Sequence, residues 1–110
     1  MTVHFRFQKS DPNRFRLREF VGSACDCLLK TLAEAENVTW SEFKKRRDYD
    51  CHPIARKSLT CALPSYISKD ETIFSLDVLG MEPGRLYGYR QAQYFYVVWF
   101  DVNHDAINMS

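Results

Sequence analysis

A histidine, an arginine and a tyrosine near the C-terminus have the side-chain types needed for acid–base chemistry on a phosphate. His104 stands three residues after Asp101, where a long apolar run ends, and Arg85 and Tyr87 alternate onto one side of the preceding segment. An imidazole moves protons near neutral pH, and a guanidinium stabilises a charged phosphorane. We therefore predict catalytic roles for His104, Arg85 and Tyr87 in cleaving RNA, with a base removing the 2′-hydroxyl proton. Asp101 either orients the imidazole or caps the turn.

Simpler roles compete with this interpretation. A histidine in such a loop also serves merely to hydrogen-bond the backbone, and tyrosines such as Tyr87 and Tyr89 also serve to cover a core. These alternatives stay open at the level of sequence.

Several basic residues are candidates for holding the RNA backbone. Guanidinium groups bind phosphate, and an exposed sheet with arginine, histidine and tyrosine suits single-stranded RNA. The predicted RNA-binding residues are Arg6, Arg90, Lys44, Lys45, Arg46 and Arg47. A net charge of +1 argues against an extensive nucleic-acid surface, so any such site depends on local clustering.

The cysteines and the remaining histidines predict neither a metal site nor a cofactor. Cys25 and Cys27 lie two residues apart in a predicted helix and point in nearly opposite directions. The other candidate ligands are Cys51, His52, Cys61 and His104, whose spacing matches no zinc motif. Cys51 and His52 are neighbours on an extended chain and face opposite ways, which argues against a thiolate–imidazole pair. A functional His52 is the less favoured interpretation, and a loop role is preferred.

Hydrophobic periodicity predicts the elements that would position these residues. Strands are expected over 3–7, 73–79, 85–91 and 94–101, a long helix over 14–37 and a short, capped helix over 39–47. The last two strands form a tight hairpin, and the segment 51–70 has no clear pattern. We expect one α+β domain over residues 1–110: an N-terminal strand, two helices and a three-stranded antiparallel meander in a two-layer sandwich. The helices cover one face, the other face is open, and the first strand lies beside the last.

Composition is that of an ordered globular chain. Of 110 residues, 45% are hydrophobic and 26% charged, and no apolar stretch reaches the length of a membrane span. The N-terminus lacks the layout of a secretory signal, so we expect a cytoplasmic protein with reduced thiols and no membrane association.

The order of several motifs resembles a known superfamily. The segments WSEF, HPI, DETIFSL, RLYGYR and FYVVWFDVNH follow one another as in a group of small bacterial and phage proteins whose C-terminal halves contain similar RI-GF and FYVLWFDP-H motifs. By size and predicted topology, this group resembles the RelE/ParE superfamily of toxin–antitoxin systems. The resemblance covers roughly residues 40–107. This chain differs from the group's pattern in having Asp77 in place of a basic residue and Val102 in place of proline.

The resemblance implies a function. RelE-type toxins cut mRNA on the ribosome with an arginine on a sheet strand and a histidine or tyrosine near the C-terminus, positions matched by Arg85 and His104 and more loosely by Tyr87 and Arg90. It thus implies an endoribonuclease whose partners are an antitoxin protein and RNA. ParE-type members share the fold but inhibit gyrase. The alternatives are therefore a non-catalytic module that inhibits a host protein, or a structural subunit.

Overall fold

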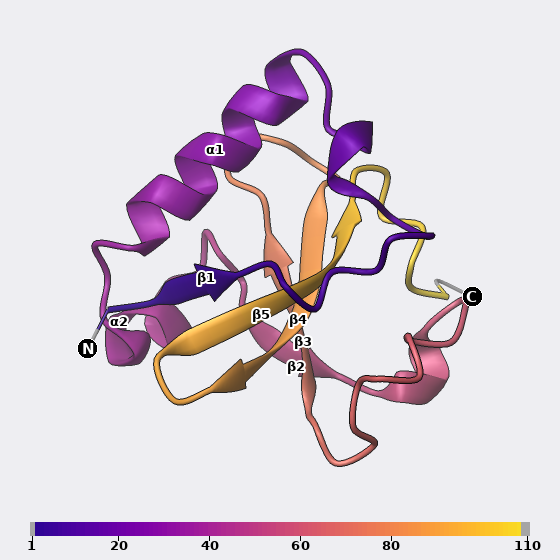
Figure 1. The fold of residues 1–110 in the computed structure, drawn as a ribbon. Helices are drawn as coiled ribbons and strands as arrows, with labels where there is room; N and C mark the ends of the chain where they lie inside the picture. Colours follow the sequence, from indigo (N-terminus) through magenta and orange to yellow (C-terminus); the bar gives the residue numbers. More distant parts are fainter. Residues whose placement is uncertain (1, 109–110) are drawn as a thin grey trace.

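The chain forms a five-stranded mixed sheet with two helices, in a computed structural model that describes residues 2–108 (Figure 1). The strands are β1 (His4–Arg6), β2 (His52–Ile54), β3 (Ile73–Asp77), β4 (Arg85–Gln91) and β5 (Tyr94–Asp101). The helices are α1 (Ser23–Ala35) and α2 (Trp40–Lys45), with short 3₁₀ turns η1 (Leu17–Glu19) and η2 (Arg56–Ser58). The spatial order is β1-β5-β4-β3-β2, in which β1 runs parallel to β5 and every other pair is antiparallel.

The sheet has one strand more than the four expected. The addition is β2, which comes from the segment without a clear pattern and pairs with β3 at the edge. A strand of three residues is too short to show alternation, and Pro53 within it is tolerated because an edge strand can lack a donor. Two other expectations are confirmed: β1 lies beside β5, and β4 and β5 form a hairpin that turns at Ala92 and Gln93.

The long helix expected over 14–37 is wrong in its first part. Helix α1 covers only Ser23–Ala35, and the residues before it form η1 and a break at Gly22, whose φ of 58° is favourable only for glycine. Leu17 and Val21 continue the apolar spacing, yet they are 53% and 70% exposed. The spacing of apolar residues alone therefore did not show that Leu17 and Val21, before the break, lie outside the core.

The short helix is confirmed, with an end at Lys45 in place of Arg47. The hydroxyl of Thr39 accepts a hydrogen bond from the backbone N–H of Glu42 at 3.2 Å, as a capping sequence requires. Neither helix in the described part of the chain has the length and apolar character needed to cross a bilayer.

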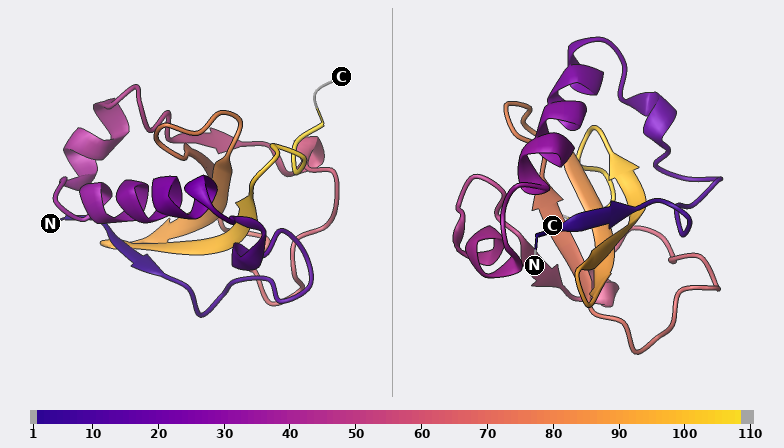
Figure 2. Two further views of the ribbon diagram at one scale, coloured as in Figure 1. Left: turned by 90° about the horizontal axis from the view of Figure 1, so that it is seen from above. Right: turned by 60° about the vertical axis from the view of Figure 1, so that its left-hand side comes forward.

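One face of the sheet packs against both helices. Phe95 and Val97 of β5 and Leu86 of β4 meet Leu28 of α1 and Phe43 of α2, and all five side chains are buried. This is the helix layer predicted from the apolar stripes, and Figure 2 shows both helices on this side.

The opposite face is also covered, which corrects the expectation of an open sheet. The loops 7–16 and 55–72 lie over it, and Figure 2 (right) shows them on the side away from α1. Tyr87 and Trp99 have no exposed surface there, and Tyr89 is 5% exposed. The Trp99 Nε1–H donates to Asp11 Oδ2 at 2.9 Å, which ties the first loop to the sheet. These aromatic rings therefore build a second core and offer no surface for a base to stack on.

A β-bulge in β5 shapes this second core. Tyr87 pairs with Trp99 and Gly88 pairs with Val97, so Val98 is the extra residue and packs on the same side as Trp99. A Cβ at Gly88 would lie 2.0 Å from the carbonyl oxygen of Tyr96. Only glycine allows the two backbones to approach so closely at this point.

Candidate active-site pocket at the sheet edge

A pocket of about 370 Å³ opens where β2, β3 and β4 meet the C-terminal loop. We call it the edge pocket. The polar residues that line it are Asp50, His52, Ser58, Ser75, Arg85 and His104. It therefore brings together His104 and Arg85, two of the three predicted catalytic residues, and adds a second histidine.

Strand register explains why these side chains meet. His52 pairs with Ser75 across β2 and β3, and Ser75 pairs with Tyr87 across β3 and β4. In the adjacent row, Arg85 lies between Asp77 and Asp101. Because side chains directly opposite one another project to the same face, both rows point to the face away from the helices.

His52 is held in a defined orientation. Its Nδ1 lies 2.8 Å from the carbonyl oxygen of Asp50 and 3.6 Å from the carboxylate of the same residue. A carbonyl oxygen only accepts, so in the neutral ring Nδ1 carries the hydrogen and Nε2 keeps its lone pair. That is the tautomer of a general base. Asp50 adopts a φ of 44°, a conformation that aspartate tolerates better than most residues.

His104 lies on a loop that Asp101 fastens to the sheet. The carboxylate of Asp101, which is 1% exposed, accepts backbone hydrogen bonds from Asp105 at 2.9 Å and Ala106 at 2.8 Å. Thr60 holds the loop from the other side through the carbonyl oxygens of Asp105 and Ala106. Both carboxylate oxygens of Asp101 are thus used by the backbone, which decides between its two expected roles: it caps the turn.

The imidazole of His104 is half-buried, and within residues 2–108 no protein group hydrogen-bonds to it. Its backbone has a φ of 60°, in the left-handed region. Such a conformation costs about 1–3 kcal/mol and persists only where the surroundings impose it. Here the Asp101 cap imposes it, and the ring is left free at the pocket.

Arg85 is anchored by a carboxylate and two carbonyl groups. Its Nε lies 2.9 Å from Asp77 Oδ1, and its Nη1 donates to the carbonyl oxygens of Pro83 and Gly84, each at 3.0 Å. Glu82 is 3.9 Å from Nη2, so this nitrogen has the weakest protein contact. Burial raises the pKa of Asp77 even though the nearby Arg85 guanidinium acts to lower it. The guanidinium is thus held by several protein contacts, of which that of Nη2 is the longest.

Tyr87, the third predicted catalytic residue, lies beneath the pocket and does not line it. It has no exposed surface, and burial raises the pKa of its phenol well above the ordinary value. The covering loop and Trp99 enclose the ring. The structure therefore does not place Tyr87 where it could reach a substrate, which corrects that prediction; its side chain is buried beside Ser75, its cross-strand neighbour.

The predicted RNA-binding residues lie away from the edge pocket. Arg6 stacks on Tyr94 at the far edge of the sheet, with 4.5 Å from its guanidinium carbon to the ring centroid, and Arg90 lies over Trp40 on the helix side at 4.3 Å. Arg46 pairs with Asp48, and that hydrogen bond raises the arginine's pKa. The run of four, Lys44, Lys45, Arg46 and Arg47, sits at the end of α2. None of these six lines the edge pocket.

The cysteine next to His52 faces the other way, as the alternation predicted. Cys51 packs on the helix side of the sheet, whereas His52 faces the edge pocket. Burial raises the pKa of the Cys51 thiol to about 11, so the sulfur is protonated at neutral pH. Among residues 2–108, no three histidine, cysteine, aspartate or glutamate side chains lie close enough together to bind a metal ion.

His52, for which a loop role was preferred, lines the edge pocket beside His104. Its signal was the segment Asp50-Cys51-His52-Pro53, in which a proline holds the histidine extended and a turn residue precedes it. This segment does not by itself show where His52 lies. The pairing of β2 with β3 places His52 beside Ser75. Comparison of the chain with models of known protein families, with curated protein sequences and with solved structures gives no match.

Proposed function

We propose that the protein is an endoribonuclease that cleaves RNA at the edge pocket by 2′-hydroxyl transesterification. The observation that carries the proposal is that His52, His104 and Arg85, from three separate parts of the chain, line one pocket. Two imidazoles and a guanidinium supply a base, an acid and a charge stabiliser, the three groups this reaction needs.

In the proposed reaction each imidazole has one role. Nε2 of His52 accepts the proton of the 2′-hydroxyl, and the 2′-oxygen forms a bond to phosphorus while the bond from phosphorus to the 5′-oxygen breaks. His104 donates a proton to the departing 5′-oxygen. The products are a 2′,3′-cyclic phosphate and a 5′-hydroxyl, and proton exchange with water restores both rings.

Arg85 and the two serines complete the arrangement. Nη2 of Arg85 donates to a non-bridging phosphate oxygen, and the rigid anchoring by Asp77 means that little reorganisation is needed as charge develops. The hydroxyl groups of Ser58 and Ser75 line the same pocket and are further donors. Asp77 neutralises the charge of Arg85, so other cations must attract the RNA backbone. Lys57 is exposed and is the direct neighbour in sequence of the pocket residue Ser58.

The resemblance to RelE/ParE toxins supports the biological setting of this proposal. We propose a cytoplasmic toxin-like protein that acts on mRNA, ribosome-bound or free, and that an antitoxin protein holds inactive. The resemblance motif FYVVWFDVNH forms β5 and the loop that presents His104, so the resembling segment and the proposed site coincide.

A cleavage assay on a short fluorescent RNA tests the activity. His52→Ala and His104→Ala each remove a proton-transfer group, whereas His4→Ala is the matched control because His4 is exposed on β1, outside the pocket. We expect both pocket variants to lose cleavage and His4→Ala to keep it. A substrate with 2′-deoxyribose at the scissile position should resist cleavage, and the products should carry a cyclic phosphate. Equal activity in all three histidine variants would refute the assignment.

Growth of cells that express the protein separates the enzyme from a binding module. If wild-type protein arrests growth, the His52→Ala/His104→Ala double variant should not. Full arrest by a folded double variant would favour the non-catalytic alternative, in which the protein inhibits a host factor by binding.

A further inference from the structure

A groove of about 500 Å³ lies on the side of β5 away from the edge pocket. Its apolar walls are Phe7, Pro12, Leu17 and Phe100, and Arg16 and Arg18 stand beside them. We call it the Phe7 groove, and no residue lines both it and the edge pocket. Consecutive residues of β5 separate the two sites, because Phe100 faces the groove while Asp101 faces the pocket side.

Several large apolar side chains in and near the Phe7 groove are exposed to solvent. Phe7 is 47% and Leu17 53% exposed, and Val21 close by in sequence is 70% exposed. The groove is also built firmly. The loop that carries it runs along β5, with hydrogen bonds from Asp11 N to Val98 O at 2.9 Å and from Phe100 N to Phe15 O at 2.7 Å. A preformed apolar hollow on a fixed loop is typical of a surface that receives a partner side chain.

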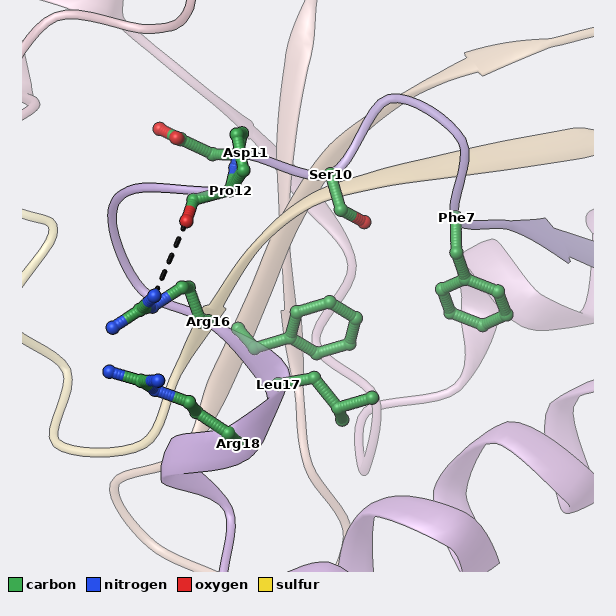
Figure 3. A pocket seen from close by; sticks show the side chains of 8 residues that line it. Phe7, Ser10, Asp11, Pro12, Arg16, Leu17 and Arg18 are labelled. Atoms are coloured by element: carbon green, nitrogen blue, oxygen red, sulfur yellow. Dashed lines mark hydrogen bonds between the residues drawn. The ribbon is translucent and has the colours of Figure 1, made fainter.

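The guanidinium groups beside the groove form no ion pair within residues 2–108. No carboxylate within residues 2–108 forms an ion pair with Arg14, Arg16 or Arg18. Figure 3 shows that Arg16 and Arg18 extend side by side to one side of the loop, while Leu17 extends to the other, toward Phe7. Among residues 2–108, the side-chain hydrogen bond of this pair is a long one, 3.5 Å, from Arg16 to the carbonyl oxygen of Pro12. Residues 16–18 thus place an apolar side chain on one side of the loop and two guanidinium groups on the other.

We propose that the Phe7 groove binds an acidic peptide segment of a partner protein, with an apolar side chain seated between Phe7 and Leu17 and carboxylates on Arg16 and Arg18. Charge complementarity favours an anionic occupant, because guanidinium groups bind carboxylates in a forked geometry, and the apolar walls favour a peptide that also carries an apolar side chain. The proposal is independent of RNA cleavage at the edge pocket.

The lining disfavours RNA as the occupant. The Ser10 hydroxyl donates to Val97 O at 2.8 Å, and the Asp11 carboxylate accepts from Asn13 N and Trp99 Nε1, each at 2.9 Å. The Ser10 hydroxyl and the Asp11 carboxylate are therefore occupied within the fold and cannot read base edges. The Phe7 ring is already stacked on Phe100, with centroids 6.1 Å apart.

A second copy of the chain fits the charge poorly. A two-fold contact through the groove would place the arginine-rich segment 14–18 of one copy close to that of the other, and like charges across an interface oppose association.

Selection from a phage-displayed library of random 12-residue peptides tests the proposal. The library is selected on wild-type protein and depleted on Leu17→Ser, a change at an exposed position that leaves the core intact. We expect the retained sequences to combine a large apolar residue with two or more aspartates or glutamates. Failure to enrich any sequence, or enrichment without acidic residues, overturns the proposal.

Binding of a retained peptide, measured by fluorescence polarisation, identifies the surface. Arg16→Glu/Arg18→Glu should weaken binding about tenfold or more, as expected when two attractive charge contacts become repulsive. The matched control is Leu29→Ser/Lys30→Glu, which changes an exposed apolar residue and a cation on α1 outside the groove.

Three results would overturn the proposal at this stage. The first is equal weakening by the control variant. The second is displacement of the peptide by a short RNA whose own binding also needs Leu17, which would assign the groove to nucleic acid. The third is a wild-type dimer in sedimentation that Leu17→Ser converts to monomer, which would assign the groove to a second copy. RNA cleavage should be unchanged in every groove variant, so the failure of one proposal does not touch the other.

Discussion

The edge pocket and the Phe7 groove lie on opposite sides of the same end of β5. They differ in whether their arginine side chains form ion pairs within the fold. In the pocket, Arg85 is paired with Asp77, and His52 is fixed by the backbone of Asp50. In the groove, the guanidinium groups of Arg16 and Arg18 form no ion pair with a carboxylate among residues 2–108. Groups that are paired within the fold have a fixed position, which suits chemistry. Groups left unpaired keep their charge available for a partner.

Removing the two pocket histidines should give the largest effect and separate the two regions. We expect His52→Ala/His104→Ala to lower the rate of RNA cleavage by about 10²- to 10⁴-fold, the usual range for acid–base groups. Leu17→Ser in the groove should leave the rate unchanged. Initial rates on the fluorescent RNA measure both variants. A Leu17→Ser loss as large as that of the histidine variant would show that the two regions act as one site.

A methyl group at Gly88 should damage both regions at once, because the β4–β5 pairing supports each of them. The added Cβ would lie 2.0 Å from Tyr96 O, so we expect Gly88→Ala to lower the free energy of unfolding by about 3 kcal/mol or more. Urea denaturation measures the change. The control is Gly84→Ala, whose Cβ would lie 3.3 Å from the Met81 sulfur and 3.4 Å from both the Met81 carbonyl oxygen and the Val78 Cβ; these contacts are far longer than 2.0 Å, so the change should cost less than half as much. Similar losses in the two variants would contradict the close-approach argument.

The paired arginine of the pocket should matter for stability. Arg85→Ala leaves the partly buried Asp77 carboxylate without its cation, and we expect a loss of about 1–3 kcal/mol at neutral pH. The loss should depend on pH. Burial already raises the pKa of Asp77, and removing Arg85 raises that pKa further. A carboxyl whose pKa is higher in the folded state than in the unfolded state costs stability as pH rises between the two values.

The destabilisation by Arg85→Ala should therefore shrink as the pH falls and Asp77 becomes protonated. Thermal unfolding of both proteins at neutral and at acidic pH measures this. A penalty that stays constant across the range would show that Asp77 is not the group left without a partner.

The unpaired arginines of the groove should matter least for stability. Arg16→Ala and Arg18→Ala break no ion pair, so each should change the free energy of unfolding by no more than about 0.5 kcal/mol. The same denaturation experiment measures them beside Arg85→Ala. A loss as large as that of Arg85→Ala would mean that these guanidiniums serve the fold and would remove the contrast between the two regions.

Much of the fold could be predicted from local patterns. The run 85–91 and the continuous apolar run 94–101, separated by two residues, marked the hairpin, and Thr39 with Glu42 marked the start of α2. The prediction failed where a pattern was short or changed direction. Three residues of β2 carry no period, and the apolar spacing before Gly22 continued past the point where the chain leaves the helix.

The candidate site was predicted in part. His104 and Arg85 were chosen for their chemistry and lie in one pocket, whereas Tyr87 was chosen on the same strand and lies buried under it. Alternation shows which residues share a face, but it does not show whether a distant loop covers that face. The loop 55–72 does cover it, and the effect on Tyr87 was not visible in the strand itself.

The sequence by itself determined which residues form the central strands and which side chains have the chemistry for proton transfer, because these depend on residue type and on neighbours a few positions away. Only the tertiary structure decided that His52 joins His104, that Asp101 holds the loop, and that Arg85 is paired while Arg16 is not. Those facts depend on contacts between residues far apart in the chain, such as 52 with 75 and 101 with 85, and no local pattern records such contacts.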